Sequence, residues 1–175
     1  MEKLLGVSRA IDALNRGVGR ATYWLVLAAV LISSGNAVAR KTLSMSSNAM
    51  LEIQWYLFAA VFMLCAGYTL LSKDHVRVDL IHARLSRRHQ LMVEIFGTLV
   101  FMLPVTTLIL VLSWAPFVDA FTSGEVSPNA GGLIRWPVKL LIPIGFGLLL
   151  LQGVSEIIKD AAELRALRRT QDTPR

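Results

Sequence analysis

The sequence predicts an all-α integral membrane protein, a bundle of four transmembrane helices that forms one domain over residues 1–175. Hydrophobic residues make up 54% of the chain and its mean hydropathy is +0.56, whereas soluble domains are usually about 45–50% apolar. The apolar residues form four long blocks separated by charged stretches. A helix needs about 20 mostly apolar residues to cross roughly 30 Å of hydrocarbon, so each block is a candidate span.

The four expected spans cover residues 21–39, 53–71, 95–112 and 138–154. The fourth block is the shortest and contains Pro143 and Gly145. Pro137, just before it, suits the first turn of a helix, where the N–H that proline lacks is not needed. Small residues in the spans allow neighbouring helices to approach closely.

Two amphipathic segments flank the spans, at residues 1–19 and 155–169. The apolar residues of the first recur at helical spacing; they are Leu4, Val7, Ile11, Leu14 and Val18. We expect this basic amphipathic helix to lie in the cytoplasmic interface of the membrane, with docking on a partner as the alternative. The second segment predicts a cytoplasmic extension of the fourth helix, in which Glu156 and Asp160 face away from an apolar stripe.

The distribution of Lys and Arg predicts the orientation of the chain. The N-terminal segment, the loop between the second and third spans and the C-terminal tail carry 14 of these cations, and the opposite side carries 4. Because Lys and Arg are enriched on the cytoplasmic side, both termini are expected in the cytoplasm. Ala37-Val38-Ala39 resembles a signal-peptide cleavage site, but the long segment before it, with Glu2 and Asp12, favours a retained first span.

Residues 114–139 are expected to form a long loop on the opposite side of the membrane. Gly131-Gly132 and the prolines Pro128 and Pro137 indicate turns in this segment. A loop of this length in so small a protein suggests either a function of its own or a lid over the bundle.

The expected spans contain little that could support catalysis or ion transport. No Asp, Lys, Arg or His lies near the centre of a span, and Glu52 and Glu94 lie close to span ends. An ion-coupled carrier needs ionisable groups at membrane depth, so this chain is not expected to transport alone. We also expect no enzymatic activity.

No cofactor or metal is expected in this chain. The single cysteine, Cys65, cannot form an intrachain disulfide, and no Cys/His ligand set is present. The histidines lie outside the spans, which argues against a haem held between helices; they are His75, His82 and His89. The basic residues flank apolar blocks and form no stripe interleaved with aromatics, so nucleic-acid binding is not expected.

Three stretches of the sequence, in order at span boundaries, carry a resemblance to a known family. They are Glu52–Phe58, Asp74–Asp79 and Leu133–Lys139, with Pro143–Phe146 following the third. In these stretches the chain resembles the small membrane (Q, or DctQ-like) subunit of tripartite ATP-independent periplasmic (TRAP) transporters. The resemblance covers roughly residues 50–156.

The resemblance implies a division of labour within secondary active transport at the bacterial inner membrane. A periplasmic solute-binding protein would capture an organic acid, usually a carboxylate, and a large multi-span subunit would carry the substrate and sodium sites. This chain would be a non-catalytic scaffold that binds the large subunit and helps dock the solute-binding protein. Residues 123–136 resemble small subunits of systems for 2-oxo acids.

Interface residues are expected on the basis of this resemblance. The expected contacts with the large subunit are Glu52, Trp55, Tyr56, Arg135 and Trp136. The cytoplasmic loop residues expected to brace a turn are His75, Arg77 and Asp79. Two alternatives stay open at this point: a self-sufficient small carrier working as a homodimer, and a membrane anchor for a redox enzyme.

Overall fold

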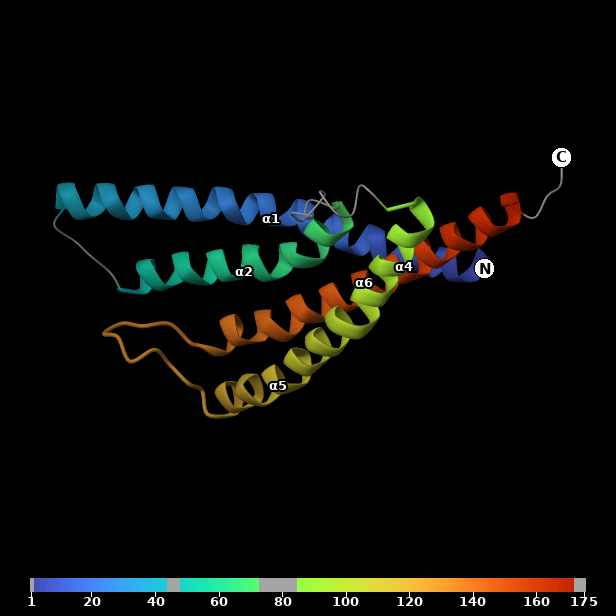
Figure 1. Cartoon of the computed structure of the whole chain (residues 1–175). Helices are drawn as coiled ribbons and strands as arrows, with labels where there is room; N and C mark the ends of the chain where they lie inside the picture. Colours follow the sequence, from blue (N-terminus) through green and yellow to red (C-terminus); the bar gives the residue numbers. More distant parts are fainter. Residues whose placement is uncertain (1, 44–47, 73–84, 172–175) are drawn as a thin grey trace.

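The computed structural model describes residues 2–43, 48–72 and 85–171, and these residues are almost entirely helical (Figure 1). The elements are α1 (Glu2–Leu43), α2 (Asn48–Ser72), α4 (Arg87–Gly97), a π-helical segment η1 (Thr98–Met102), α5 (Leu103–Thr122) and α6 (Trp136–Gln171). Four stretches are long and apolar enough to cross a membrane: Glu2–Thr42, Asn48–Ser72, Arg87–Thr122 and Trp136–Leu167. The predicted all-α fold with four candidate spans is confirmed.

The helices are longer than the apolar blocks. α1 has 42 residues and α6 has 36, whereas about 20 are enough to cross the hydrocarbon. α1 continues without a break through the amphipathic segment at residues 1–19 and the first span, so the two are one helix. Likewise, α6 begins at Trp136, has Pro137 in its first turn, and continues through residues 155–169.

The expected long loop at residues 114–139 is wrong in extent. α5 continues to Thr122 and α6 begins at Trp136, so the connection covers only residues 123–135. Aromatic residues three and four apart extend the helix past Pro116: the ring centroids of Trp114 and Phe117 are 5.5 Å apart, and those of Phe117 and Phe121 are 6.1 Å apart. Such pairs stabilise a helix locally.

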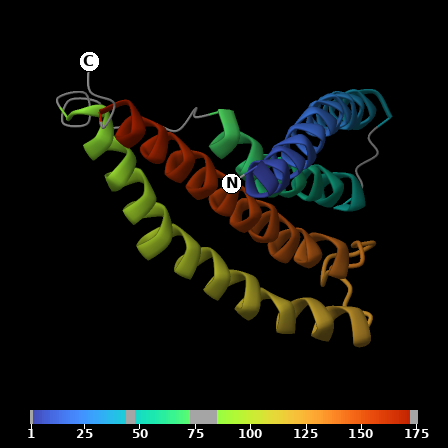
Figure 2. The same ribbon diagram turned by 90° about the vertical axis from the view of Figure 1, so that its right-hand side faces the viewer.

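The bundle is open. Figure 2 shows α6 between the α1–α2 pair and α5, and the N-terminal half of α1 packs directly on α6. α6 contacts α1, α2, α4 and α5, while α5 packs mainly on α6. Large apolar faces of α2 and α5 are left uncovered by the described residues, and their exposed side chains include Phe62 and Phe121.

The buried face of α1 is the polar one. Buried residues recur every seven positions along the helix, the repeat of a coiled-coil seam; they are Ser8, Asn15, Thr22, Ala29 and Asn36. Leu4, Val7 and Leu14 of the apolar stripe are about half exposed. In a membrane the surroundings are apolar, so small and polar side chains gather between helices instead of facing outward.

The same inversion occurs in α6. Glu156 and Asp160 are buried, and Val154 is more exposed than either. We expected these two carboxylates to lie off the apolar stripe, and the side of α6 away from that stripe is the side that is buried in the bundle. The apolar stripe was correctly located along the helix, but periodicity marks a face without saying whether lipid, water or protein covers it.

Two glycines allow the central helices to come together. A Cβ at Gly145 of α6 would lie 2.7 Å from the backbone oxygen of Met63 in α2. A Cβ at Gly67 of α2 would clash with Asn15 Oδ1, which is buried and has no hydrogen-bond partner among the described residues. The α-hydrogens of Gly67 thus face this oxygen, a weak contact that recurs at close helix crossings.

We expect Gly145→Ala to destabilise the protein, because the added methyl group meets backbone of α2 that cannot rotate away. The cost is expected to be about 1–3 kcal/mol, as for other overpacked sites. Gly147→Ala is the matched control, since a Cβ there meets nothing within 4 Å. Thermal unfolding in mild detergent measures both; equal midpoints for the two variants would contradict the close packing of α2 on α6.

Candidate functional site

Polar side chains form two clusters at opposite ends of the helices. The first, the loop cluster, joins residues 123–135 to the starts of α2 and α6. The second, the α1–α6 cluster, lies between the N-terminal half of α1 and the C-terminal half of α6. Between them, residues 53–71 of α2 and 140–154 of α6 contain no charged side chain.

Glu52 is the centre of the loop cluster. Its side chain is buried near the start of α2, with 6% of the residue exposed. Its carboxylate accepts hydrogen bonds from Asn129 Nδ2 at 2.7 Å, from the backbone N–H of Leu133 at 2.7 Å, and from Ser127 Oγ. Both carboxylate oxygens are engaged, so Glu52 holds the loop onto α2 with charge-assisted hydrogen bonds.

The backbone of the loop is shaped to present these donors. Gly124 and Gly131 have positive φ angles of 63° and 71°, a conformation that residues with a Cβ rarely adopt. The N–H of Ser127 donates to the carbonyl of Leu133 at 2.9 Å. Two further side chains of α2 hold the loop: Asn48 Nδ2 donates to the carbonyl of Ala130 at 3.1 Å, and the Tyr56 hydroxyl donates to that of Ile134 at 3.3 Å.

Ion pairs fix the two ends of the loop to each other. Glu125 accepts from Arg135 Nη1 at 3.0 Å and from Lys139 Nζ. The hydrogen bond from Lys139, with the charge of Lys139 and Arg135, holds the pKa of Glu125 below its ordinary value of 4.5. The rings of Phe121 and Trp136, 5.5 Å apart and edge to face, join the end of α5 to the start of α6.

The lowered pKa of Glu125 predicts a pH dependence. A carboxylate with a lowered folded-state pKa stabilises the fold above its unfolded pKa, and this contribution is lost as pH falls through the folded value. Glu125→Gln is therefore expected to lower the thermal midpoint at pH 7 and to have a smaller effect at pH 3. An equal effect at both pH values would show that the charge of Glu125 contributes nothing.

The structure brings Glu52, Tyr56 and Arg135 together around the loop, but these residues do not form one exposed surface. Glu52 is buried, Tyr56 and Trp136 are half-buried, and Arg135 is exposed. Trp55 is 71% exposed and shares a face of α2 with Phe58 and Phe62, three and seven residues further on. The contact of all five residues with a partner stays a prediction. His75, Arg77 and Asp79 lie outside the described residues.

The α1–α6 cluster was missed by sequence reasoning. Asp12 of α1 lies beside Gln152, Ser155 and Lys159 of α6. Its Oδ1 accepts from Gln152 Nε2 at 2.9 Å and Ser155 Oγ at 2.7 Å, and its Oδ2 lies 3.1 Å from Lys159 Nζ. Lys159 Nζ is also 2.6 Å from Glu156 Oε1.

The buried seam of α1 completes this cluster. Asn15 Nδ2 donates to Gln152 Oε1 at 2.9 Å, and the hydroxyls of Ser8 and Ser155 are 2.7 Å apart. Gln152 and Ser155 are completely buried. The sequence does contain a signal for this cluster, because Ser8, Asn15 and Thr22 recur every seven residues. The apolar residues of the same helix form a stronger periodic pattern, and the prediction was based on that pattern.

α4 is tied to the same end of α6. Arg87 forms a two-pronged ion pair with Glu163, at 2.7 and 2.8 Å, and Leu91 is completely buried. Both charged side chains are a little under half exposed, so their pairing contributes little by itself. The fully buried Leu91 is the firmer attachment.

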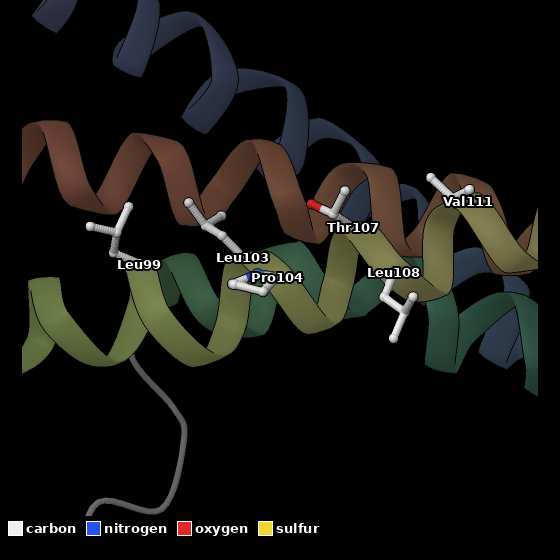
Figure 3. Close-up of a pocket in the computed structure, with 6 residues that line it drawn as sticks. All are labelled: Leu99, Leu103, Pro104, Thr107, Leu108 and Val111. Carbon is white, nitrogen blue, oxygen red and sulfur yellow. The ribbon is translucent and has the colours of Figure 1, made fainter.

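α5 carries a shallow apolar groove of about 550 Å³ (Figure 3), lined by Leu99, Leu103, Pro104, Thr107, Leu108 and Val111. It begins at the π-helical turn η1. Pro104 lacks an N–H and its ring would meet the carbonyl four residues earlier, which accounts for the widened turn. The hydroxyl of Thr106 donates to the carbonyls of Met102 and Leu103 at 2.7 and 3.0 Å, as hydroxyls do at helix irregularities in membranes.

These sites can hold helices and a loop in place. In the described part of the chain, no three His, Cys, Asp or Glu side chains are grouped so that they could hold a metal ion. The carboxylates of Glu52 and Asp12 accept hydrogen bonds from neighbours in this chain. Such engaged groups stabilise the architecture, and the uncovered apolar faces of α2 and α5 are what this chain offers to its surroundings.

Comparison with known proteins identifies a family. Residues 29–163 match the family profile described as tripartite ATP-independent periplasmic transporters, DctQ component. The match includes α2, η1, α5 and most of α6, together with Glu52 and the loop that it holds. No curated protein and no solved structure matches the chain.

Proposed function

Because the chain belongs to the DctQ family of tripartite ATP-independent periplasmic transporter components, we propose that it is a non-catalytic scaffold in such a transporter. In this role it binds the large membrane subunit and helps to dock the periplasmic solute-binding protein. The large subunit carries the substrate and sodium sites, and the substrate is an organic acid, a carboxylate of the 2-oxo acid type. The chain lies in the inner membrane with both termini in the cytoplasm.

One observation carries this proposal: the middle of each of the spans 21–39, 53–71, 95–112 and 138–154 contains no charged side chain. Transport of an organic anion with sodium requires polar groups at membrane depth. The open row of helices instead exposes apolar faces, including Trp55, Phe58 and Phe62 of α2. These faces suit a subunit that packs against another membrane protein.

The loop cluster supports a role in docking the solute-binding protein. Glu52, Tyr56 and Asn48 hold residues 123–135 in a defined conformation, and Val126 and Ile134 are about half exposed on it. Pre-ordering a loop lowers the entropic cost of binding. A loop held in this way is a suitable surface for a soluble partner on that side of the membrane.

Reconstitution in liposomes tests the proposal. With a sodium gradient and the solute-binding protein, we expect carboxylate uptake when both membrane subunits are present, little uptake without this chain, and none with this chain alone. Sodium-driven uptake by this chain alone would overturn the scaffold role. Full uptake by the large subunit and binding protein without this chain would show that the scaffold is dispensable.

A further inference from the structure

α4 and η1 carry an exposed apolar surface next to the end of α6 that holds the α1–α6 cluster. All the exposed residues between Leu91 and Leu103 are apolar; they are Met92, Val93, Phe96, Leu99, Val100 and Phe101. The rings of Phe96 and Phe101 pack edge to face, with their centroids 6.1 Å apart. This surface continues the exposed apolar face of α5, and it extends beyond residue 95, where the third span was expected to begin.

The N-terminal half of α1 lies beside residues 153–163 of α6. The hydroxyl of Ser8 is 2.7 Å from that of Ser155, and Asp12 Oδ2 is 3.1 Å from Lys159 Nζ. Between Ser8 and Asp12 in the chain, Arg9 is exposed. A guanidinium group is costly to place in hydrocarbon. This side of the chain therefore lies in water at the level of the α1–α6 cluster.

α4 and η1 lie beside the same residues of α6, on its other side (Figure 2). Arg87 at the start of α4 pairs with Glu163, and a Cβ at Gly153 would lie 3.0 Å from the terminal methyl carbon of Met102. Phe96 lies between Arg87 and Met102 in the chain, so it lies near the level of the α1–α6 cluster. At one level of α6, one flank of the chain is thus charged and the other is apolar.

The apolar length of this helical stretch also exceeds the thickness of the hydrocarbon. Exposed large apolar residues recur from Met92 to Val118, which is about 39 Å along the helix axis at 1.5 Å per residue. The hydrocarbon is only roughly 30 Å thick. A longer apolar stretch is accommodated when the helix tilts or kinks. Tilting the chain so that α4 moves toward the membrane would bring this extra length into lipid.

We propose that the boundary between hydrocarbon and water crosses this end of the chain obliquely. Lipid hydrocarbon covers Met92–Phe101 on the α4 side, while the α1 side is in water at the same level of α6. Arg88, exposed at the start of α4, then lies among the anionic headgroups, where cations are favoured. A level boundary would put either Phe96 into water or Arg9 into hydrocarbon. The oblique boundary therefore fixes the tilt of the chain in the membrane.

Lipid fits this surface better than a second protein does. Helix–helix interfaces in membranes are enriched in small and polar residues, as in the buried seam of α1 at Ser8 and Asn15. The exposed residues of α4 and η1 are instead large and apolar, and none of them offers a hydrogen-bonding side chain. Hydrocarbon needs no such group, because it covers apolar surface without specific contacts.

Nitroxide labels at matched positions test this proposal in the full chain, in nanodiscs of phosphatidylethanolamine and phosphatidylglycerol. Cysteines are introduced one at a time at the exposed positions Val93, Phe96, Ala10 and Val105, in a background that carries Cys65→Ser. Oxygen concentrates in hydrocarbon and a nickel chelate stays in water, so the ratio of the two accessibilities reports the surroundings. We expect Val93→Cys and Phe96→Cys to give the high ratio of Val105→Cys, in the middle of the third span, and Ala10→Cys to give the low ratio of a label in water.

Three other outcomes would each overturn the oblique boundary. Low ratios at positions 93 and 96 would place the surface of α4 in water. A high ratio at position 10 would place both flanks in lipid, so that the boundary is level. Shielding of positions 93 and 96 from both reagents, in the chain alone or in the assembled transporter, would show that protein covers the surface. The use of two positions on α4 guards against local distortion by one label, and circular dichroism checks that each variant keeps its helices.

Discussion

Replacing Lys159 with methionine is expected to lower the free energy of unfolding by about 2–3 kcal/mol. Lys159 neutralises Asp12 and Glu156, which lie 3.1 and 2.6 Å from its Nζ and are mostly buried. Breaking a fully buried pair by removing one partner costs about 3–5 kcal/mol. The effect here is smaller because the Lys159 side chain is 31% exposed. Unfolding in mixed detergent, followed by circular dichroism, measures the change.

Two companion variants make this prediction specific. Lys41→Met removes an exposed cation from the last turn of α1. This variant is expected to leave the free energy of unfolding almost unchanged. Adding Glu156→Gln to Lys159→Met removes one of the two stranded carboxylates and is expected to restore more than half of the lost stability. If Lys159→Met is as stable as Lys41→Met, the α1–α6 cluster does not stabilise the packing of these helices.

Replacing Glu52 with alanine is expected to release the loop at residues 123–135. The backbone N–H of Leu133 and the side chains of Asn129 and Ser127 lose their acceptor. A hydrogen bond to a charged group contributes about 1.5–3 kcal/mol, so hydrogen exchange at the Leu133 amide should become about tenfold to a hundredfold faster. Gln54→Ala, two residues further along α2, is the control and is expected to leave the loop protected.

The same variants decide how Glu52 acts on partners. Because its carboxylate is buried, we expect it to act through the loop, and not by direct contact. Asn129→Ala keeps Glu52 and weakens its hold on the loop, so both variants should reduce binding of the solute-binding protein. If Glu52→Ala weakens assembly with the large subunit while the loop stays protected, direct contact is the better explanation.

The candidate spans could be predicted because their cause is local. A helix that crosses hydrocarbon must be apolar over about 20 residues, whatever it packs against. The end of α5 was harder to predict from the sequence. Ring contacts among Trp114, Phe117 and Phe121 extend this helix, and hydropathy does not detect such contacts. Gly145 could be recognised as a small residue, but its contact with Met63 depends on how α2 and α6 cross.

The candidate sites could be predicted from the sequence only in part. Glu52 stood out as a carboxylate at the start of an apolar block, yet its donors lie 75 to 81 residues later in the chain. Asp12 and Lys159 are 147 residues apart and gave no sign of pairing. Glu156 and Asp160 were expected to lie off the apolar stripe of α6, but their burial within the bundle could not be predicted, because periodicity does not say which face of a helix packs on protein.

The sequence alone determined that this protein is helical, that four of its segments are suited to a membrane, and that the middle of each is uncharged. Those properties follow from composition along the chain, since hydrocarbon tolerates only long apolar helices. The tertiary structure decided which face of each helix turns inward. Lipid is as apolar as a protein core, so burial of apolar side chains gives no preference for protein over lipid. The inward face of α1 is set by Ser8, Asp12 and Asn15, whose side chains find hydrogen-bond partners on α6.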